Sequence, residues 1–242
     1  MATFPRTTVG GESVSRMIVG TNWFLGWSHA TDAKDRLIRD LVMERTRIAE
    51  ILAVFFAAGV DTVMGPFPHP PLLDAVRDAE QRSGVKAVIV STPSFTVGPH
   101  IPEAIIYADD TSLDVETYIS IFNCAGFLMQ IEVDWTAQII AQARRPVMTI
   151  KPLAAGRVRP FQGLTFAWNA IRDVDMVTVG TMSAREAQEC IELSLEIPER
   201  RGRGTCPYRK VHPPGAPCRR VLDPSRSGSS GPVELRLTAL TA

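Results

Sequence analysis

Short apolar runs alternate with longer amphipathic segments along most of the chain. The runs at 17–20, 60–64, 86–90, 115–122, 146–150 and 176–179 have the length of buried strands. Between them, apolar residues recur at helical spacing around 48–56, 72–79, 139–143, 164–171 and 187–195. Unbroken apolar runs are typical of parallel strands covered on both faces. The alternation therefore predicts an α/β fold built on a parallel sheet.

The number of strands decides whether this sheet can close. A further short run at 95–98 follows the run at 86–90 with no helix between them, which gives seven strands, an odd number for a closed barrel. We predict a TIM-type (β/α)8 barrel that lacks one βα unit near residue 93; the alternative is a sheet that stays open.

The pattern stops after Pro198. Residues 199–232 are rich in Arg, Gly, Pro and Ser and have no apolar period, so they cannot bury a core. We assign residues 1–198 to a barrel domain and 199–242 to a low-complexity tail that we expect to be disordered. Under an alternative hypothesis, the tail is read in a shifted frame and the chain is an imperfect copy of a longer protein.

Composition narrows the class of protein. The chain has 242 residues, 45% of them hydrophobic, and a formal net charge of zero, which fits one globular domain and argues against nucleic-acid or acidic-membrane partners. Neither a membrane-spanning apolar run nor a secretion signal is recognisable, so we expect a cytoplasmic protein with a small-molecule ligand. The four cysteines form no C-x-x-C pair, and the oligomeric state stays open.

The strand at 176–179 leads into the strongest candidate for a ligand site. Gly180, Thr181 and Met182 form a turn, and Ser183 begins a helix with Glu186 three residues on, the spacing of a capping box. First-turn amides and the helix dipole attract anions, and many barrels bind phosphate after their last two strands. We predict a phosphate-binding site at 180–183 with Arg185; an ordinary βα turn without a ligand is the alternative.

Lys151 is the strongest candidate for chemistry. It ends the strand at 146–150, and barrels place catalytic groups at the carboxyl ends of their strands. If Met148, Ile150 and Leu153 desolvate the amine, its pKa falls, and it could form a Schiff base or stabilise an oxyanion. Alternatively, Lys151 pairs with a carboxylate such as Glu132 on a neighbouring strand end.

Two polar residues at other strand ends could assist Lys151. Asn123 could hold a carbonyl or carboxamide, or it could only close its own turn. Glu132 is our candidate for a general base. His29, His69 and His100 each follow a strand end, but without a ligand-type spacing we predict no metal site. A loop carrying Trp23, Phe24 and Trp27, with a helix near 32–43, could cover the barrel mouth or merely plug one end.

Several motifs in this order resemble the aldo-keto reductase superfamily. They are G-T-N at 20–22, F-N at 122–123, K-P-L-A-A-G at 151–156 and V-G-T-M-S-x-x-E-A at 179–187. G-P-H-I-P-E at 98–103 takes the place of that family's Gly-x-Ser-Asn turn, 119–123 resembles its Q-x-x-Y-N strand, and 180–183 resembles its cofactor-phosphate turn. The resemblance covers residues 12–197, is nearest to an uncharacterised branch, and implies a (β/α)8 barrel that binds NADP(H).

The sequence departs from that family in its catalytic set of Asp, Tyr, Lys and His. Asp61 stands where the Asp is expected, but Pro66 and Phe67 follow where the Tyr belongs. The third strand ends in Ser91-Thr92 instead of Lys, and the strand that would carry the His is missing. Hydride transfer to a carbonyl needs an acid beside its oxygen, so the standard reductase chemistry lacks its proton donor here.

The functional prediction is therefore an aldo-keto-reductase-like barrel that binds NADP(H) or another phosphorylated ligand at its mouth and has oxidoreductase-like activity. Two alternatives remain: a lyase- or aldolase-type enzyme centred on Lys151, and a ligand-binding or remnant barrel without catalysis. Lys151, Asn123 and Glu132 are the predicted catalytic residues. Gly180, Thr181, Met182, Ser183 and Arg185 are the predicted cofactor-binding residues.

Overall fold

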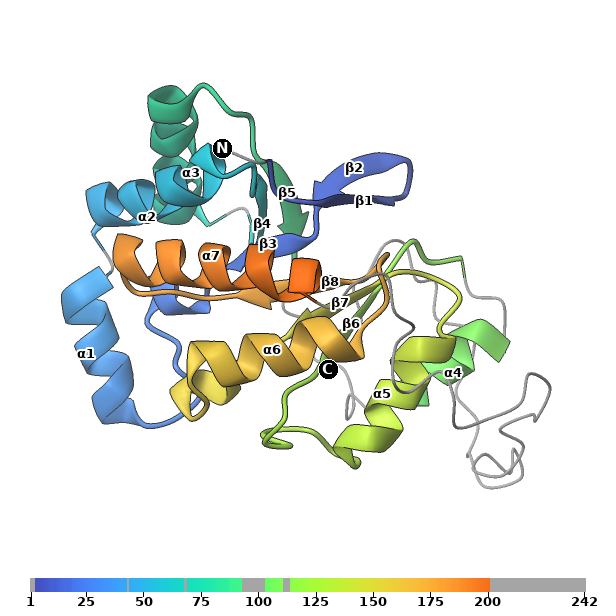
Figure 1. Ribbon diagram of the computed structural model, residues 1–242. Helices are drawn as coiled ribbons and strands as arrows, with labels where there is room; N and C mark the ends of the chain where they lie inside the picture. The colour runs from blue at the N-terminus through green and yellow to red at the C-terminus, as the bar shows by residue number, and fades with distance from the viewer. Residues whose placement is uncertain (1–2, 43, 68, 93–102, 111–113, 201–242) are drawn as a thin grey trace, which may run out of the picture.

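The computed structural model describes residues 3–42, 44–67, 69–92, 103–110 and 114–200 (Figure 1). Six parallel strands form one sheet in the order β5-β4-β3-β8-β7-β6. They are β3 (Met17–Gly20), β4 (Thr62–Gly65), β5 (Val88–Ser91), β6 (Tyr118–Ile121), β7 (Val147–Ile150) and β8 (Met176–Val179). The predicted α/β class and parallel sheet are confirmed.

The sheet is curled into a half-barrel. Ile18, Met64, Ile119, Met148 and Met176 come from five different strands, yet they pack into one buried cluster with Val14. Side chains from strands on both halves of the sheet meet in this way only if the inner face is concave. Among the described residues no pairing joins β5 to β6, so these two are the edges of the sheet. The strand predicted at 95–98 lies outside the described residues.

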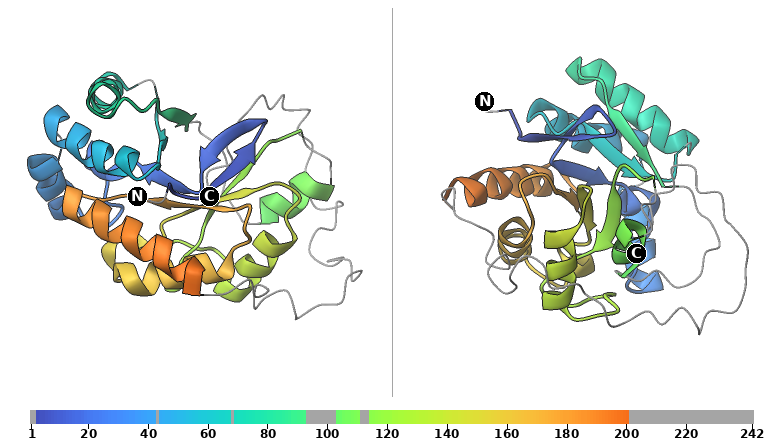
Figure 2. Two further views of the ribbon diagram at one scale, coloured as in Figure 1. Left: turned by 45° about the horizontal axis from the view of Figure 1, so that its top comes forward. Right: turned by 90° about the vertical axis from the view of Figure 1, so that its right-hand side faces the viewer.

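Helices cover the outer face of the curled sheet (Figure 2). Neighbouring contacts follow the order α3 (Pro70–Ser83), α2 (Arg45–Ala57), α7 (Ala184–Arg200), α6 (Pro160–Ala170). Further along lie α5 (Val133–Gln142) and α4 (Glu103–Asp110), which contact each other. The second, larger apolar core lies between these helices and the sheet. The amphipathic faces predicted from spacing, such as Ile48, Leu52 and Phe55 of α2, are buried in it.

A hairpin closes the amino ends of the central strands. Strands β1 (Arg6–Val9) and β2 (Glu12–Ser15) pair through a Gly10-Gly11 turn in which both residues have positive φ, as a tight two-residue hairpin turn requires. Ser15 N donates to Thr62 Oγ1 at 3.0 Å at the start of β4. The opposite, carboxyl ends of the strands therefore remain available for a site.

Helix α7 runs to Arg200, past the domain boundary predicted at residue 198. The predicted tail at 201–242 lies outside the described residues and stays a prediction. In the described ranges, none of the helices combines the length and the apolar character needed to span a bilayer.

Candidate ligand cavity at the carboxyl ends of the strands

A cavity of about 700 Å³ opens at the carboxyl ends of β3, β4, β7 and β8. Its floor includes Gly20, Met64, Ile150 and Thr178, one from each strand. Its volume lies in the range of small-molecule sites. The mouth of the half-barrel is therefore concave, and it lies at the carboxyl ends of the strands, where Lys151 and the turn at 180–182 were predicted to bind a ligand.

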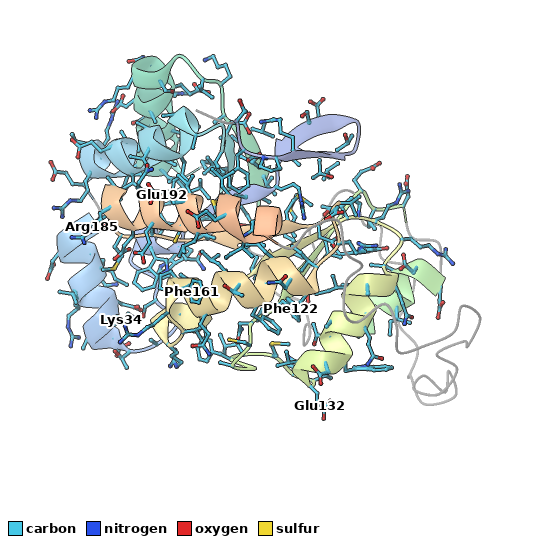
Figure 3. The ribbon with its side chains drawn as sticks, in the orientation of Figure 1. Lys34, Phe122, Glu132, Phe161, Arg185 and Glu192 are labelled. Carbon is cyan, nitrogen blue, oxygen red and sulfur yellow. The ribbon has the colours of Figure 1, made fainter. Side chains whose placement is uncertain are left out.

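Lys151 lines this cavity directly after β7. Its φ is +60°, an uncommon conformation for a residue with a side chain. Burial lowers the pKa of the ammonium from its ordinary value of 10.5. Among the described residues, no hydrogen bond or ion pair engages this side chain. The proposed pairing with Glu132 is not formed: Glu132 is exposed at the N-cap of α5 and points away from the sheet (Figure 3).

The predicted turn meets Lys151 in the same cavity. Gly180, Thr181 and Met182 all line it. Gly180 is needed for a packing reason, because a Cβ there would come within 2.4 Å of Trp23 Cδ1. The Trp23 side chain thus packs directly against the turn and forms part of the cavity wall.

Helix α7 begins with the predicted capping box, with one difference. Glu186 N donates to Ser183 Oγ at 3.2 Å, as expected, but the Glu186 carboxylate accepts from Met182 N at 2.8 Å instead of the Ser183 amide. One amide of the turn is therefore already occupied by a carboxylate. Ser183 and Arg185 are not among the lining residues, and Arg185 is exposed on the outer side of α7 (Figure 3).

Two hydroxyl groups offer this cavity polar contacts instead. Thr178 is 7% exposed and Thr181 2%, and neither Oγ1 has a hydrogen-bond partner among the described residues. A buried polar atom without a partner is unfavourable unless a ligand or water satisfies it. Both residues line the cavity, so a ligand there could accept hydrogen bonds from both.

Asn123 does not line the cavity. It is fully buried, its Nδ2 donates to the carbonyl oxygen of Phe127 at 3.0 Å, and its Oδ1 accepts from Phe127 N at 2.9 Å. Of the two interpretations offered by the sequence, the structure matches an Asn that closes its own loop.

The cavity also contains residues that the sequence did not single out. Lys34 reaches in from α1 (Asp32–Val42), donates to the carbonyl oxygen of Ala155 at 2.9 Å and lies 4.9 Å from the centre of the Trp23 ring. Arg157 and Arg159 line the wall after β7, and Glu186 and Glu189 line the α7 side. With Lys151, the lining holds four cationic side chains against two carboxylates, a balance that favours an anionic ligand.

His29 stands at the rim of the cavity with Asn22. Asn22 Nδ2 lies 2.8 Å from His29 Nε2, and because an amide nitrogen donates, Nε2 accepts and the neutral ring carries its hydrogen on Nδ1. Partial burial and the charge of Lys151 lower the pKa of His29, while Asp35 raises it to a lesser extent. The loop at 21–29 and α1 thus contribute to the mouth, and Phe24 packs into the core.

The other histidines do not join His29. His69 is at the N-cap position of α3 without a side-chain capping hydrogen bond, and His100 lies outside the described residues. Over the described ranges, no group of three His, Cys, Asp or Glu side chains could hold a metal ion.

Asp61 is wrongly placed for the catalytic role that its sequence position suggested. It precedes β4, at the end of the strand opposite the cavity, and its carboxylate accepts from Arg6 Nη1 at 2.8 Å. This ion pair attaches the β1–β2 hairpin to the sheet. Asp61 therefore belongs to the closed end of the half-barrel.

No protein-family model and no curated protein matches the sequence. Two solved structures from Pseudomonas aeruginosa, each named a candidate aldo-keto reductase, are similar to the chain. The TM-scores are 0.52 and 0.53, the identities 12% and 11%, and the matches cover 81% of this chain and 98% and 97% of those chains. The chain has an aldo-keto-reductase-like fold. At 12% and 11% identity the likeness establishes the fold alone. The roles of the cavity residues are therefore argued from the cavity of this chain.

Proposed function

We propose that the cavity binds NADP(H) or another phosphate-bearing small molecule and that the protein has oxidoreductase-like activity. The observation that carries this proposal is that Lys151 and the turn at 180–182 line one cavity. The fold supports the proposal because its structural neighbours bear reductase names.

The lining residues fit a phosphate-bearing cofactor. Lys151, Arg157 and Arg159 would balance phosphate charge, and the Thr178 and Thr181 hydroxyls would donate to oxygen atoms. Glu186 works against an anion at the turn, because it already holds the Met182 amide. NADPH, when bound, would supply a hydride, and the half-buried Lys151 ammonium would hold a proton near a carbonyl oxygen in place of the missing tyrosine.

Isothermal titration calorimetry with NADPH tests this proposal. We expect one binding site, and Lys151→Met should weaken binding by about tenfold, or about 1.4 kcal/mol, because a partly desolvated charge is lost. Lys86→Met is the matched control: Lys86 is exposed, pairs with Glu80 and lies away from the cavity, so affinity should not change. Absence of binding at about 1 mM NADPH would exclude the dinucleotide.

A further inference from the structure

Lys151 differs from the two other lysines that the structure describes. The sequence contains four, Lys34, Lys86, Lys151 and Lys210. Lys34 is held by the Ala155 carbonyl and the Trp23 ring, and Lys86 is paired with Glu80 at an exposed position. Lys151 faces the cavity without a partner among the described residues, so its amine is free to react.

The backbone at this site is strained. Only five described residues other than glycine have positive φ, and three of them, His29, Lys151 and Ala155, line the cavity. Such conformations cost free energy and persist where the surrounding structure imposes them, often at functional sites. The strained backbone thus lies at residues of the cavity lining, including the two that carry the Lys151 amine and the His29 ring.

The groups around Lys151 suit a carbonyl compound. The Thr178 and Thr181 hydroxyls can donate to a carbonyl oxygen, and the His29 ring can take up a proton at Nε2 when Nε2 releases its hydrogen bond from Asn22. Burial lowers the pKa of Lys151, which increases the fraction of neutral, nucleophilic amine near pH 7. The charged groups lining the same cavity are Lys34, Arg157, Arg159, Glu186 and Glu189.

We infer that Lys151 condenses with small aldehydes that carry an anionic group, forming a Schiff base in this cavity, with His29 as the proton-transfer group. The ammonium first gives a proton to His29 Nε2, which releases its hydrogen bond from Asn22. The amine nitrogen then attacks the carbonyl carbon, forming a C–N bond and a carbinolamine. His29 returns the proton to the carbinolamine hydroxyl, which leaves as water, and a protonated C=N bond remains.

Anionic aldehydes are the expected class because cationic side chains outnumber carboxylates in the lining. This inference does not require dinucleotide binding. Its test contains no NADPH, so failure of the proposed function and failure of the inference are separable.

Reductive trapping with glyoxylate and sodium cyanoborohydride tests the inference on the full chain. The hydride reduces the imine to a stable secondary amine, and peptide mapping by mass spectrometry measures modification at each lysine over time. We expect Lys151 to be modified at least about tenfold faster than Lys86, because the cavity holds the aldehyde beside the Lys151 amine, whereas Lys86 meets it only from bulk solvent. In urea the two rates should converge, because unfolding removes the cavity.

Three comparisons complete the design. Lys151→Arg keeps the charge and should abolish the fast adduct. His29→Asn is chosen because asparagine tolerates the positive φ of this position. It should slow labelling of Lys151 at least about tenfold without affecting Lys86. Glycolaldehyde, a neutral aldehyde of similar size, should give a smaller ratio of Lys151 to Lys86 labelling than glyoxylate.

The inference is overturned if Lys151 in the folded wild-type chain reacts no faster than Lys86. A fast adduct that persists in Lys151→Arg would also overturn it. An unchanged rate in His29→Asn would remove His29 from the reaction, and an equal ratio with glycolaldehyde would remove the preference for anions. Because the lysines of one wild-type molecule are compared, the result stands even if a variant fails to fold.

Discussion

Lys151 combines a left-handed backbone, a half-buried amine and the absence of a paired carboxylate among the described residues. Each of these features is unfavourable for stability. A protonated amine in a desolvated position raises the free energy of the native state relative to the unfolded chain, where the lysine is hydrated. The position therefore fits a chemical role better than a structural one.

Lys151→Met should stabilise the protein in a pH-dependent way. Below the lowered pKa of Lys151, both the native and the unfolded states carry the proton, and the native state bears the whole desolvation penalty. As pH rises from that pKa towards the unfolded value, the penalty is relieved. The gain in free energy of unfolding should be largest near pH 7, about 0.5–1 kcal/mol because the side chain is only partly buried, and should shrink towards pH 10.

Urea denaturation of the variant and the wild type at pH 7 and pH 10 measures this difference. Lys86→Met is the control and should show no gain that disappears with pH, because Lys86 is exposed. If the gain in free energy of unfolding for Lys151→Met instead grew with pH, burial of a charged amine could not be its cause.

For single residues, the sequence predicted which side chains follow the ends of strands, but it did not predict which of these side chains share one cavity. Lys151 and Gly180 follow neighbouring strands β7 and β8, so they reach the same cavity. Asn123 also ends a strand, but its amide is used within its own loop. His29 and Lys34 come from the long connection after β3, for which the sequence left two alternatives open, covering the mouth or plugging one end, and in the structure this connection lines the mouth.

Helix α7 shows how one element supports the cavity. Its start is fixed by the Ser183 and Glu186 hydrogen bonds, and Ala187 and Ile191 are buried against the core. The capped first turn holds the 180–182 segment against Trp23. Geometry of the cavity wall therefore depends on the helix cap.

Ser183→Ala should lower the free energy of unfolding by about 1 kcal/mol, because the Glu186 amide loses its acceptor. Glu189→Gln, on the same helix and exposed, should change it by less than about 0.5 kcal/mol. Urea denaturation of both variants measures the difference. Equal stabilities of the wild type and Ser183→Ala would show that the cap contributes nothing.

In the whole molecule, stabilising ion pairs lie at the amino ends of the strands, and the candidate ligand site lies at their carboxyl ends. At the amino ends, the hairpin is held by Arg6 and Asp61, and Arg172 pairs with Asp175 at the start of β8. At the carboxyl ends lie Lys151 and the turn after β8. This division is the usual one in barrels of this kind.

Asp61→Asn therefore distinguishes the observed position from the one suggested by sequence. We expect a loss of about 1 kcal/mol in stability, because a partly buried ion pair with Arg6 is removed. NADPH affinity and Lys151 trapping should be unchanged. A selective loss of either, with stability intact, would return Asp61 to the active site.

The order of elements was predictable over most of the chain because periodicity and glycine stops are local signals. Gly84, for example, ends α3 with a φ of +71°, as its position after an amphipathic run indicated. Closure of the sheet was not predictable, since it depends on pairing between distant segments. The expected count of seven strands and the six that pair in the described sheet differ at residues 95–98, outside the described ranges.

The sheet order has a consequence for how the chain assembles. Strands β3, β4 and β5 form one consecutive trio and β6, β7 and β8 another, and in the described sheet the two trios are joined only where β3 pairs with β8, from Met17–Val177 to Val19–Val179. During synthesis the first trio is complete long before residue 177 leaves the ribosome. One side of β3 must wait unpaired throughout that interval, a period in which a chaperone or a neighbouring nascent chain competes for it.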